Sequence, residues 1–247
     1  MIQRLSFSDD VRISEKNQVI GLKPQFPKPE VFRLLGGRGG RLGTRSTVRK
    51  VNDWTSRLGA ISSPRLVYTI EPVVQITASH VRLQRGEPFK SAKLARALQG
   101  SEAVVCFVAT LGQEVQHQIS HLSNGGKLSD AYIVDAIASV GTEQTVESFQ
   151  SQMRDGCRRY GKGVTLRFSP GYCDWPIEEQ TKVFRVVEAG RIGVRLTDSF
   201  LMTPSKSVSG VFGIVQGAGA SLPHNPCLLC GRSHCLGRRT ERTTADN

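Results

Sequence analysis

A continuous apolar run constrains the fold of this 247-residue chain more than any other feature of its sequence. Residues 103–109 read Ala-Val-Val-Cys-Phe-Val-Ala and include no charged side chain. A short run of this kind predicts a buried strand, and it is far shorter than the roughly 20 apolar residues that a membrane-spanning helix needs. The chain must therefore enclose this strand in a core, and it is long enough to do so without disulfide bonds.

Helical and β-rich patterns alternate on both sides of this strand. The β-rich stretches are residues 65–70, 73–77, 164–168 and most of the chain between residues 191 and 215. Helical patterns cover residues 29–35, 91–98, 113–122, 129–154 and 174–190. Because the alternation has no clean βαβ period, it predicts an α+β fold with one mixed or antiparallel sheet.

The longest predicted helix, residues 129–154, carries two glutamates on one face. Glu143 and Glu147 are four residues apart, so successive turns place them side by side, where two ionised carboxylates repel each other mildly. Apolar side chains form a broad stripe along the same helix, at Tyr132, Ile133, Ile137, Val140, Phe149 and Met153. The pattern predicts a helix that packs one side against the core.

The net charge of +12 is concentrated near the start of the chain. Residues 1–60 hold 12 basic and 5 acidic side chains, a net charge of +7. We interpret residues 1–27 as an irregular basic lead-in, because they combine turn-forming residues with few periodic apolar positions. A basic arm can bind polyanions without sequence specificity, but a solvated tail is the commoner outcome. Only 6% of the residues are aromatic, so we do not expect a nucleic-acid partner.

The first residues and the cysteines bear on the compartment. The chain opens without the long apolar segment of a secretory signal, so we expect a cytoplasmic protein that does not bind membranes and whose six cysteines stay reduced.

The glycine-rich residues 36–43 lack the Lys-Ser/Thr pair that ends a phosphate-binding P-loop. We therefore interpret them as a flexible turn.

One candidate site lies where a predicted strand runs into a turn and then a helix, in the string Arg167-Phe-Ser-Pro-Gly-Tyr-Cys-Asp-Trp-Pro176. Arg167 offers a planar fork for a carboxylate. Gly171 follows a proline and forces a turn whose amides can approach a ligand, and Tyr172 adds a flat face and a hydroxyl group. The alternative is an arginine that pairs with a structural carboxylate beside an ordinary turn.

A second candidate site is the polar stretch of residues 197–210, which is rich in small side chains and lies between apolar strands. Such a loop could contact a phosphate or an amide-bearing ligand. The alternative is a polar hairpin connection, which the local pattern favours.

In their order along the chain, these segments resemble a known family. Arg167-x-x-Pro-Gly-Tyr172, Leu196-Thr-Asp-Ser-Phe200 and Ser207-Val-Ser-Gly210 are together similar to the activation domain of cobalamin-dependent methionine synthase, in its stand-alone form. The resemblance covers about residues 28–215. It implies a single α+β domain with a curved sheet flanked by helices. We place this domain at residues 28–220, before a cysteine-containing tail at residues 221–247.

The resemblance also implies a ligand and partners. Domains of this family bind S-adenosylmethionine (AdoMet) and dock onto a cobalamin-carrying module, where an inactive Co(II) corrinoid takes one electron and is remethylated from the sulfonium. For this chain it implies a corrinoid-binding methyltransferase as partner and a flavodoxin- or ferredoxin-like protein as the source of the electron.

Individual residues take roles from the same resemblance. Arg167 would grip the AdoMet carboxylate, main-chain groups around Ser169 and Gly171 would hold the adenosine, and Tyr172 would lie near the reacting methyl group. A helix glutamate contributes to AdoMet binding: Glu143 is the best match, and Glu147 is the alternative register. The residue types agree with the ligand, because a zwitterionic sulfonium compound needs a guanidinium for its carboxylate and anions for its cationic groups.

The segment after this domain contains Cys227, Cys230 and Cys235 in a C-x2-C-x4-C pattern, with His224 and His234 nearby. Thiolates at this spacing can hold one metal site, and their softness suits zinc or an iron–sulfur cluster. Plain reduced thiols on a tail are the alternative. An iron–sulfur centre could pass an electron to a corrinoid.

Two further functions stay open. One is a metal-binding electron-transfer adaptor that acts on a corrinoid protein and has a vestigial AdoMet groove. The other is a basic interaction protein whose arm binds an acidic partner or nucleic acid.

Overall fold

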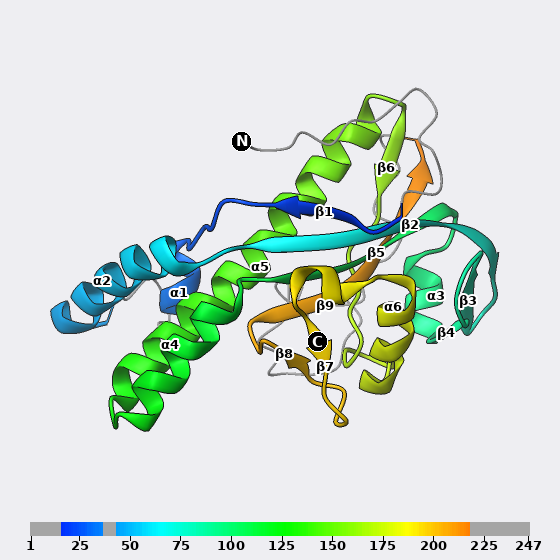
Figure 1. Ribbon diagram of the computed structural model, residues 1–247. Helices are drawn as coiled ribbons and strands as arrows, with labels where there is room; N and C mark the ends of the chain where they lie inside the picture. Colours follow the sequence, from blue (N-terminus) through cyan, green and yellow to red (C-terminus); the bar gives the residue numbers. More distant parts are fainter. Residues whose placement is uncertain (1–15, 37–42, 218–247) are drawn as a thin grey trace, which may run out of the picture.

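The structure is a computed structural model and describes residues 16–36 and 43–217 (Figure 1). Its main element is a seven-stranded sheet. Six strands follow the order β4-β3-β2-β5-β9-β6, and the seventh, β1, pairs with the first four residues of β2. The strands of this sheet are β1 (Gln18–Gly21), β2 (Arg65–Ile76), β3 (His80–Leu83), β4 (Phe89–Lys90), β5 (Ser101–Thr110), β6 (Lys162–Val164) and β9 (Ser207–Gln216). Every neighbouring pair is antiparallel.

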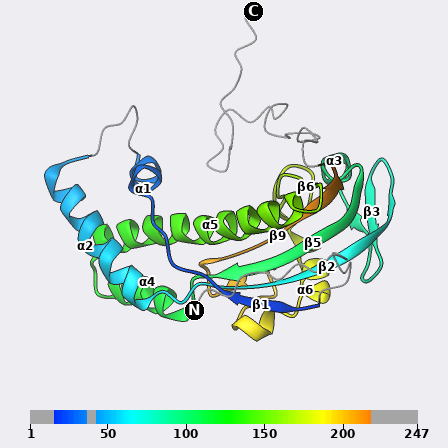
Figure 2. The same cartoon turned by 90° about the horizontal axis from the view of Figure 1, so that it is seen from above.

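Helices cover both faces of this sheet, and Figure 2 shows α5 and α6 on opposite sides of its curved long strands. The helices are α1 (Lys28–Leu34), α2 (Arg45–Ile61), α3 (Ala92–Ala97), α4 (Gln113–Asn124), α5 (Leu128–Arg158) and α6 (Gln180–Val186), with the 3-10 turns η1 (Ile177–Glu179) and η2 (Ala189–Ile192). A small hairpin joins β7 (Arg195–Leu196) to β8 (Met202–Thr203). The described residues form a single α+β domain with an antiparallel sheet, as the sequence predicted.

The apolar run of residues 103–109 is the central strand β5, which pairs with β2 on one side and β9 on the other. Because side chains alternate along a strand, β5 contributes to two cores. Val104, Cys106 and Val108 face the α6-side core, which also contains Trp175 and Val183. The α5-side core takes the alternate residues Ala103, Val105, Phe107 and Ala109 of the strand, together with Phe149 and Phe212. Burial on both faces explains why the run has no polar position.

The 31-residue helix α5 belongs to two cores along its length. Its second half packs Val146, Phe149 and Met153 against the sheet. Its first half packs Val134 and Ile137 against α1, α2 and α4, in a third core without strands. At Gly141 the helix lets the Phe26 ring approach so closely that a Cβ would lie 2.4 Å from a ring carbon.

Most predicted elements are present, with several differences. Of residues 164–168, predicted as one strand, only Val164 belongs to a strand, β6, and Phe168 forms an isolated bridge with Val211. Residues 65–70 and 73–77 are one strand, β2, because Pro72 causes no break in its pairing with Ala103. The helix predicted over residues 174–190 is divided into η1, α6 and η2. Residues 18–21, inside the predicted irregular lead-in, form β1 on the edge of β2.

Helix α2 was not predicted, although its sequence contains a helical signal. Thr44 caps it, since its side chain accepts a hydrogen bond from the Thr47 amide at 3.2 Å. Val51 and Leu58 are its buried residues, seven apart on one face, and both belong to the third core. These two buried positions did not give a recognisable helical pattern, because most of the helix is polar and a glycine-rich stretch precedes it. Among the described residues, no helix is long and apolar enough to cross a membrane.

We predict that Phe149→Ala lowers the free energy of unfolding by about 3–5 kcal/mol, the usual cost of removing a buried aromatic ring. Phe149 is fully buried, and its ring centroid lies 5.0 Å from that of Tyr68 and about 6 Å from those of Phe107 and Phe212. Tyr132→Ala on the same helix is the matched control, because Tyr132 is 60% exposed; its cost should stay near 0.5 kcal/mol. Urea unfolding measures both, and equal losses would contradict the assignment of the core.

Candidate functional site

Arg167 lies on a short extended segment that runs beside the edge of β9. Thr165 and Phe168 donate their amides to the Gly213 and Val211 carbonyl oxygens at 2.9 and 2.8 Å. Phe168 faces the α6-side core, and because side chains alternate, Arg167 points to the opposite side, where α5 lies. Gly210 permits this approach, since a Cβ there would lie 2.8 Å from the Phe168 carbonyl oxygen.

The guanidinium of Arg167 is held between two carboxylates of α5. Its Nη2 lies 2.7 Å from Glu143 Oε2, and its Nη1 lies 2.7 Å from Glu147 Oε2. The Arg167 side chain is 8% exposed, whereas those of Glu143 and Glu147 are 53% and 49% exposed. The three charged residues that the sequence predicted for one site therefore form one cluster, which we call the Arg167 cluster.

Gln150 completes the Arg167 cluster and was not predicted. Its Oε1 accepts a hydrogen bond from Arg167 Nη1 at 3.3 Å, and its Nε2 donates to the Thr165 carbonyl oxygen at 2.8 Å. The side chain thus ties the segment that carries Arg167 to α5, and it is almost completely buried. Its position three residues after Glu147, and so on the same helix face, was the available signal.

The predicted turn after Arg167 is present, and its amides are engaged within it. Gly171 has a φ of +86° and donates its amide to the Trp175 carbonyl oxygen at 2.8 Å. The Tyr172 amide donates to the Ser169 carbonyl oxygen at 3.3 Å. The amides of Gly171 and Tyr172, for which the sequence predicted contact with a ligand, are therefore used by the turn itself. The Tyr172 side chain is half exposed.

Asp174 fastens the end of this turn to helix α3. Its carboxylate accepts hydrogen bonds from the Ser91 hydroxyl at 2.6 Å and the Lys93 amide at 3.1 Å. Burial raises the pKa of Asp174, but these hydrogen bonds outweigh it and hold the pKa below its usual value. Ser91 itself caps α3 by accepting from the Leu94 amide.

Trp175 fastens the same end of the turn into the α6-side core. The ring is buried, with centroids 5.4 Å from Phe89 and 6.1 Å from Phe168. Its Nε1 donates to Glu179 Oε2 at 3.4 Å. Between Phe168 and Trp175, the exposed residues Tyr172 and Cys173 are thus presented by a segment that is held at both ends.

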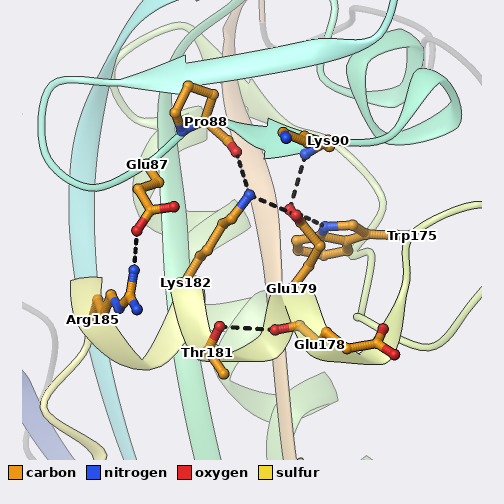
Figure 3. A network of polar contacts seen from close by, with 9 residues as sticks. All are labelled: Glu87, Pro88, Lys90, Trp175, Glu178, Glu179, Thr181, Lys182 and Arg185. Carbon is orange, nitrogen blue, oxygen red and sulfur yellow. Dashed lines mark hydrogen bonds and ion pairs between the residues drawn. The ribbon is translucent and has the colours of Figure 1, made fainter.

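Figure 3 shows a polar network next to the ring of Trp175, with the Glu179 carboxylate at its centre. The Glu179 carboxylate accepts hydrogen bonds from Lys182 Nζ at 2.5 Å and the Lys90 amide at 2.9 Å. Lys182 Nζ also donates to the Pro88 carbonyl oxygen at 2.9 Å. Burial raises the pKa of Glu179, but the hydrogen bonds from Lys182 and Lys90 outweigh it, so the pKa lies below its usual value.

The second candidate stretch, residues 197–210, contains the turn of the β7–β8 hairpin and the start of β9. Gln180 holds this stretch: its Nε2 donates to the Phe200 carbonyl oxygen at 2.6 Å, and its Oε1 accepts from the Ser209 hydroxyl at 2.8 Å. Lys206 reaches α5, where its Nζ lies 2.7 Å from Asp135 Oδ1 and 3.0 Å from Ser139 Oγ. The first part of the stretch is a hairpin connection, the alternative that the sequence pattern favoured.

The predicted metal ligands Cys227, Cys230 and Cys235 lie outside the described residues. Within residues 16–36 and 43–217, no group of three or more His, Cys, Asp or Glu side chains is arranged to hold a metal ion. Of the three cysteines in these ranges, Cys106 and Cys157 are buried, and burial raises the pKa of the Cys157 thiol to about 11.

The Arg167 cluster has a specific chemical capacity. A guanidinium fork binds a carboxylate in two-point fashion, and the adjacent half-exposed glutamates can pair with ammonium or other cationic groups. Together they suit a compound that carries both charges close to each other, such as an α-amino acid.

Two comparisons with known proteins found matches, and a third found none. Residues 94–218, just over half of the chain, match the family described as vitamin B12 dependent methionine synthase, activation domain. A crystal structure described as the MetH reactivation domain bound to AdoHcy is similar in fold, with a TM-score of 0.62 and 17% sequence identity. That match covers 86% of this chain and 81% of the other. No curated protein matches.

The network of Figure 3 predicts a pH-dependent contribution of Glu179 to stability. At pH 7, Glu179→Gln should lower the free energy of unfolding by about 1.5–3 kcal/mol, the range for hydrogen bonds to charged groups. Since the folded pKa lies below the unfolded value, this contribution is complete above about pH 4.3 and is lost as the pH falls through the folded pKa. Urea unfolding between pH 7 and pH 3 measures it.

The neighbouring Glu178→Gln is the control for this series, because Glu178 is exposed and accepts the Thr181 hydroxyl only through its main-chain oxygen. It should change stability little at any pH. A constant difference between Glu179→Gln and wild type down to pH 3 would contradict the assignment.

Proposed function

The chain belongs to the activation-domain family of vitamin B12-dependent methionine synthase, and we propose from this premise that it binds AdoMet and supports reductive remethylation of a corrinoid on a partner protein. The observation that carries the proposal is the Arg167 cluster, in which one nearly buried guanidinium meets two half-exposed carboxylates. The fold relative bound to AdoHcy supports a ligand of the same class.

In this proposal the ligand's carboxylate binds the fork of Arg167, and Glu143 or Glu147 turns to the α-ammonium group. Gln150 keeps the guanidinium in place during this exchange, because its amide is bonded to both Arg167 and the Thr165 carbonyl oxygen. The residues present therefore fit the amino-acid part of AdoMet.

The adenosine part would lie along the turn at Ser169 and Gly171, next to the Arg167 segment. Tyr172 would lie near the reacting methyl group. Two features support this role of Tyr172: its side chain is half exposed, and the turn that carries it is held in place by Asp174 and Trp175. A fixed position matters here, because transfer of a methyl group from a sulfonium depends on placement more than on acid–base catalysis.

The remaining components come from other proteins in this proposal. A corrinoid-binding methyltransferase would carry the cobalamin, and a flavodoxin- or ferredoxin-like protein would supply the electron that makes the corrinoid nucleophilic. Bound AdoMet would supply the methyl group, and the residues of this chain would bind and orient it.

We predict that Arg167→Ala weakens AdoMet binding by a factor of about 30 or more, the usual effect of removing one partner of a desolvated charge pair. Isothermal calorimetry of the full chain measures it. Arg185→Ala is the matched control, because Arg185 also pairs with a carboxylate, that of Glu87, but is 61% exposed and lies on α6. No AdoMet binding by the folded wild-type chain, or equal binding by both variants, would contradict the proposed site.

A second candidate function rests on the spacing of Cys227, Cys230 and Cys235, which suits an iron–sulfur cluster or zinc. In this role the chain would be an electron-transfer adaptor for a corrinoid protein, and the AdoMet groove would be vestigial.

For this second function, we predict stoichiometric iron or zinc in protein purified without oxygen, and loss of the metal from a variant with all three cysteines changed to serine. Elemental analysis and the visible spectrum measure this. Cys106→Ser, a change to a cysteine buried in the α6-side core, should retain the metal. If the wild-type protein contains no metal, the three cysteines are plain reduced thiols and this second function is wrong.

A further inference from the structure

The Arg167 cluster carries more negative than positive charge. Two carboxylates, Glu143 and Glu147, share one guanidinium, so the formal charge of the cluster is −1. Gln150, the other side chain bonded to Arg167, is neutral. The next ion pair along α5 is Asp135 with Lys206, which is neutral overall and does not offset this excess.

The surplus carboxylate has no counterpart in the amino-acid part of a ligand. A ligand carboxylate would use the guanidinium, and a ligand ammonium would use one glutamate, which leaves the second glutamate for another cation. Both glutamates are about half exposed, so each can turn towards a bound molecule without leaving the protein surface. A third charge on the ligand, and a positive one, therefore suits the cluster.

We propose that Glu143 and Glu147 together set the specificity of the site for the sulfonium form of the ligand over the thioether form. This inference rests on the proposed function. AdoMet has a carboxylate, an ammonium and a sulfonium, a net charge of +1, whereas S-adenosylhomocysteine (AdoHcy) lacks the third charge. When the methyl group passes to a nucleophilic acceptor, the C–S bond breaks and its electron pair stays on sulfur, so the ligand becomes neutral. The surplus carboxylate then favours its exchange for fresh AdoMet.

A series of variants with graded charge tests the proposal. Wild type, the single variants Glu143→Gln and Glu147→Gln, and the double variant give the cluster formal charges of −1, 0 and +1. Half-exposed ion pairs contribute only modestly to a binding free energy. The preference for AdoMet over AdoHcy should therefore fall about threefold with each substitution. Calorimetry with both ligands gives the ratio of dissociation constants, and salt should reduce it in wild type.

A third ligand separates charge from the methyl group itself. Sinefungin carries an ammonium near the position of the sulfonium, so it should follow AdoMet through the series. Glu30→Gln is the matched control, because Glu30 is 48% exposed and pairs with Arg33 at 2.8 Å on another helix; it should leave all ratios unchanged.

The outcomes distinguish this inference from the proposed function. If wild type binds both ligands through Arg167 but the ratio stays constant through the series, the inference is wrong and the proposed function stands. If sinefungin follows AdoHcy instead of AdoMet, charge is not the cause and the inference also fails. If the folded wild type binds none of the three ligands, the proposed function fails and the inference with it.

Discussion

The burial of β5 on both faces is the constraint on which the rest of the molecule depends. A strand with Val104, Cys106 and Val108 on one side and Val105 and Phe107 on the other has to be covered twice. Helix α5 covers one face and α6, with the segment around Trp175, covers the other. The Arg167 segment lies at the edge of β9, between these two layers, so the same requirement that builds the cores also brings Arg167 to α5.

The Arg167 cluster is held in place by main-chain and amide hydrogen bonds, whereas Tyr172 on the following turn is half exposed. Gln150 and the pairing with β9 fix Arg167 from behind. Asp174 and Trp175 hold the far end of the turn in the opposite core, with Glu179 behind the indole. Between these two anchors, Tyr172 and Cys173 are exposed to solvent. An arrangement of this kind suits a protein whose task is to present one ligand to a second macromolecule, because the ligand is placed before the partner arrives.

The sequence predicted the class of fold, most elements and the charged members of the site, but not how they are joined. The apolar run and the helical patterns report burial directly, so β5 and α5 were predicted. Arg167 was predicted from its local pattern, and Glu143 and Glu147 were assigned to the same site from a resemblance. Their contact across 20–24 residues depends on tertiary packing. The contacts of Gln150 and Asp174 were missed: the position of Gln150 on the face of Glu147 was the only signal for the first, and the contact of Asp174 with Ser91 and Lys93 joins residues more than 80 apart, which no local pattern reports. Helix α2 was missed because its apolar stripe is narrow.

The alternation between Arg167 and Phe168 has a consequence for how such a sequence can vary in length. The two side chains leave the same short segment in opposite directions, one to a charged cluster and one to an apolar core. A single residue inserted between Arg167 and Phe168 would place both side chains on the same side of the segment, so either the guanidinium would lose Glu143 or the phenyl ring would leave the core around Trp175. An insertion after Ser169 would leave Arg167 and Phe168 in place and change the turn that carries Tyr172. The step from Arg167 to Phe168 therefore tolerates no change in length without loss of one of these two contacts.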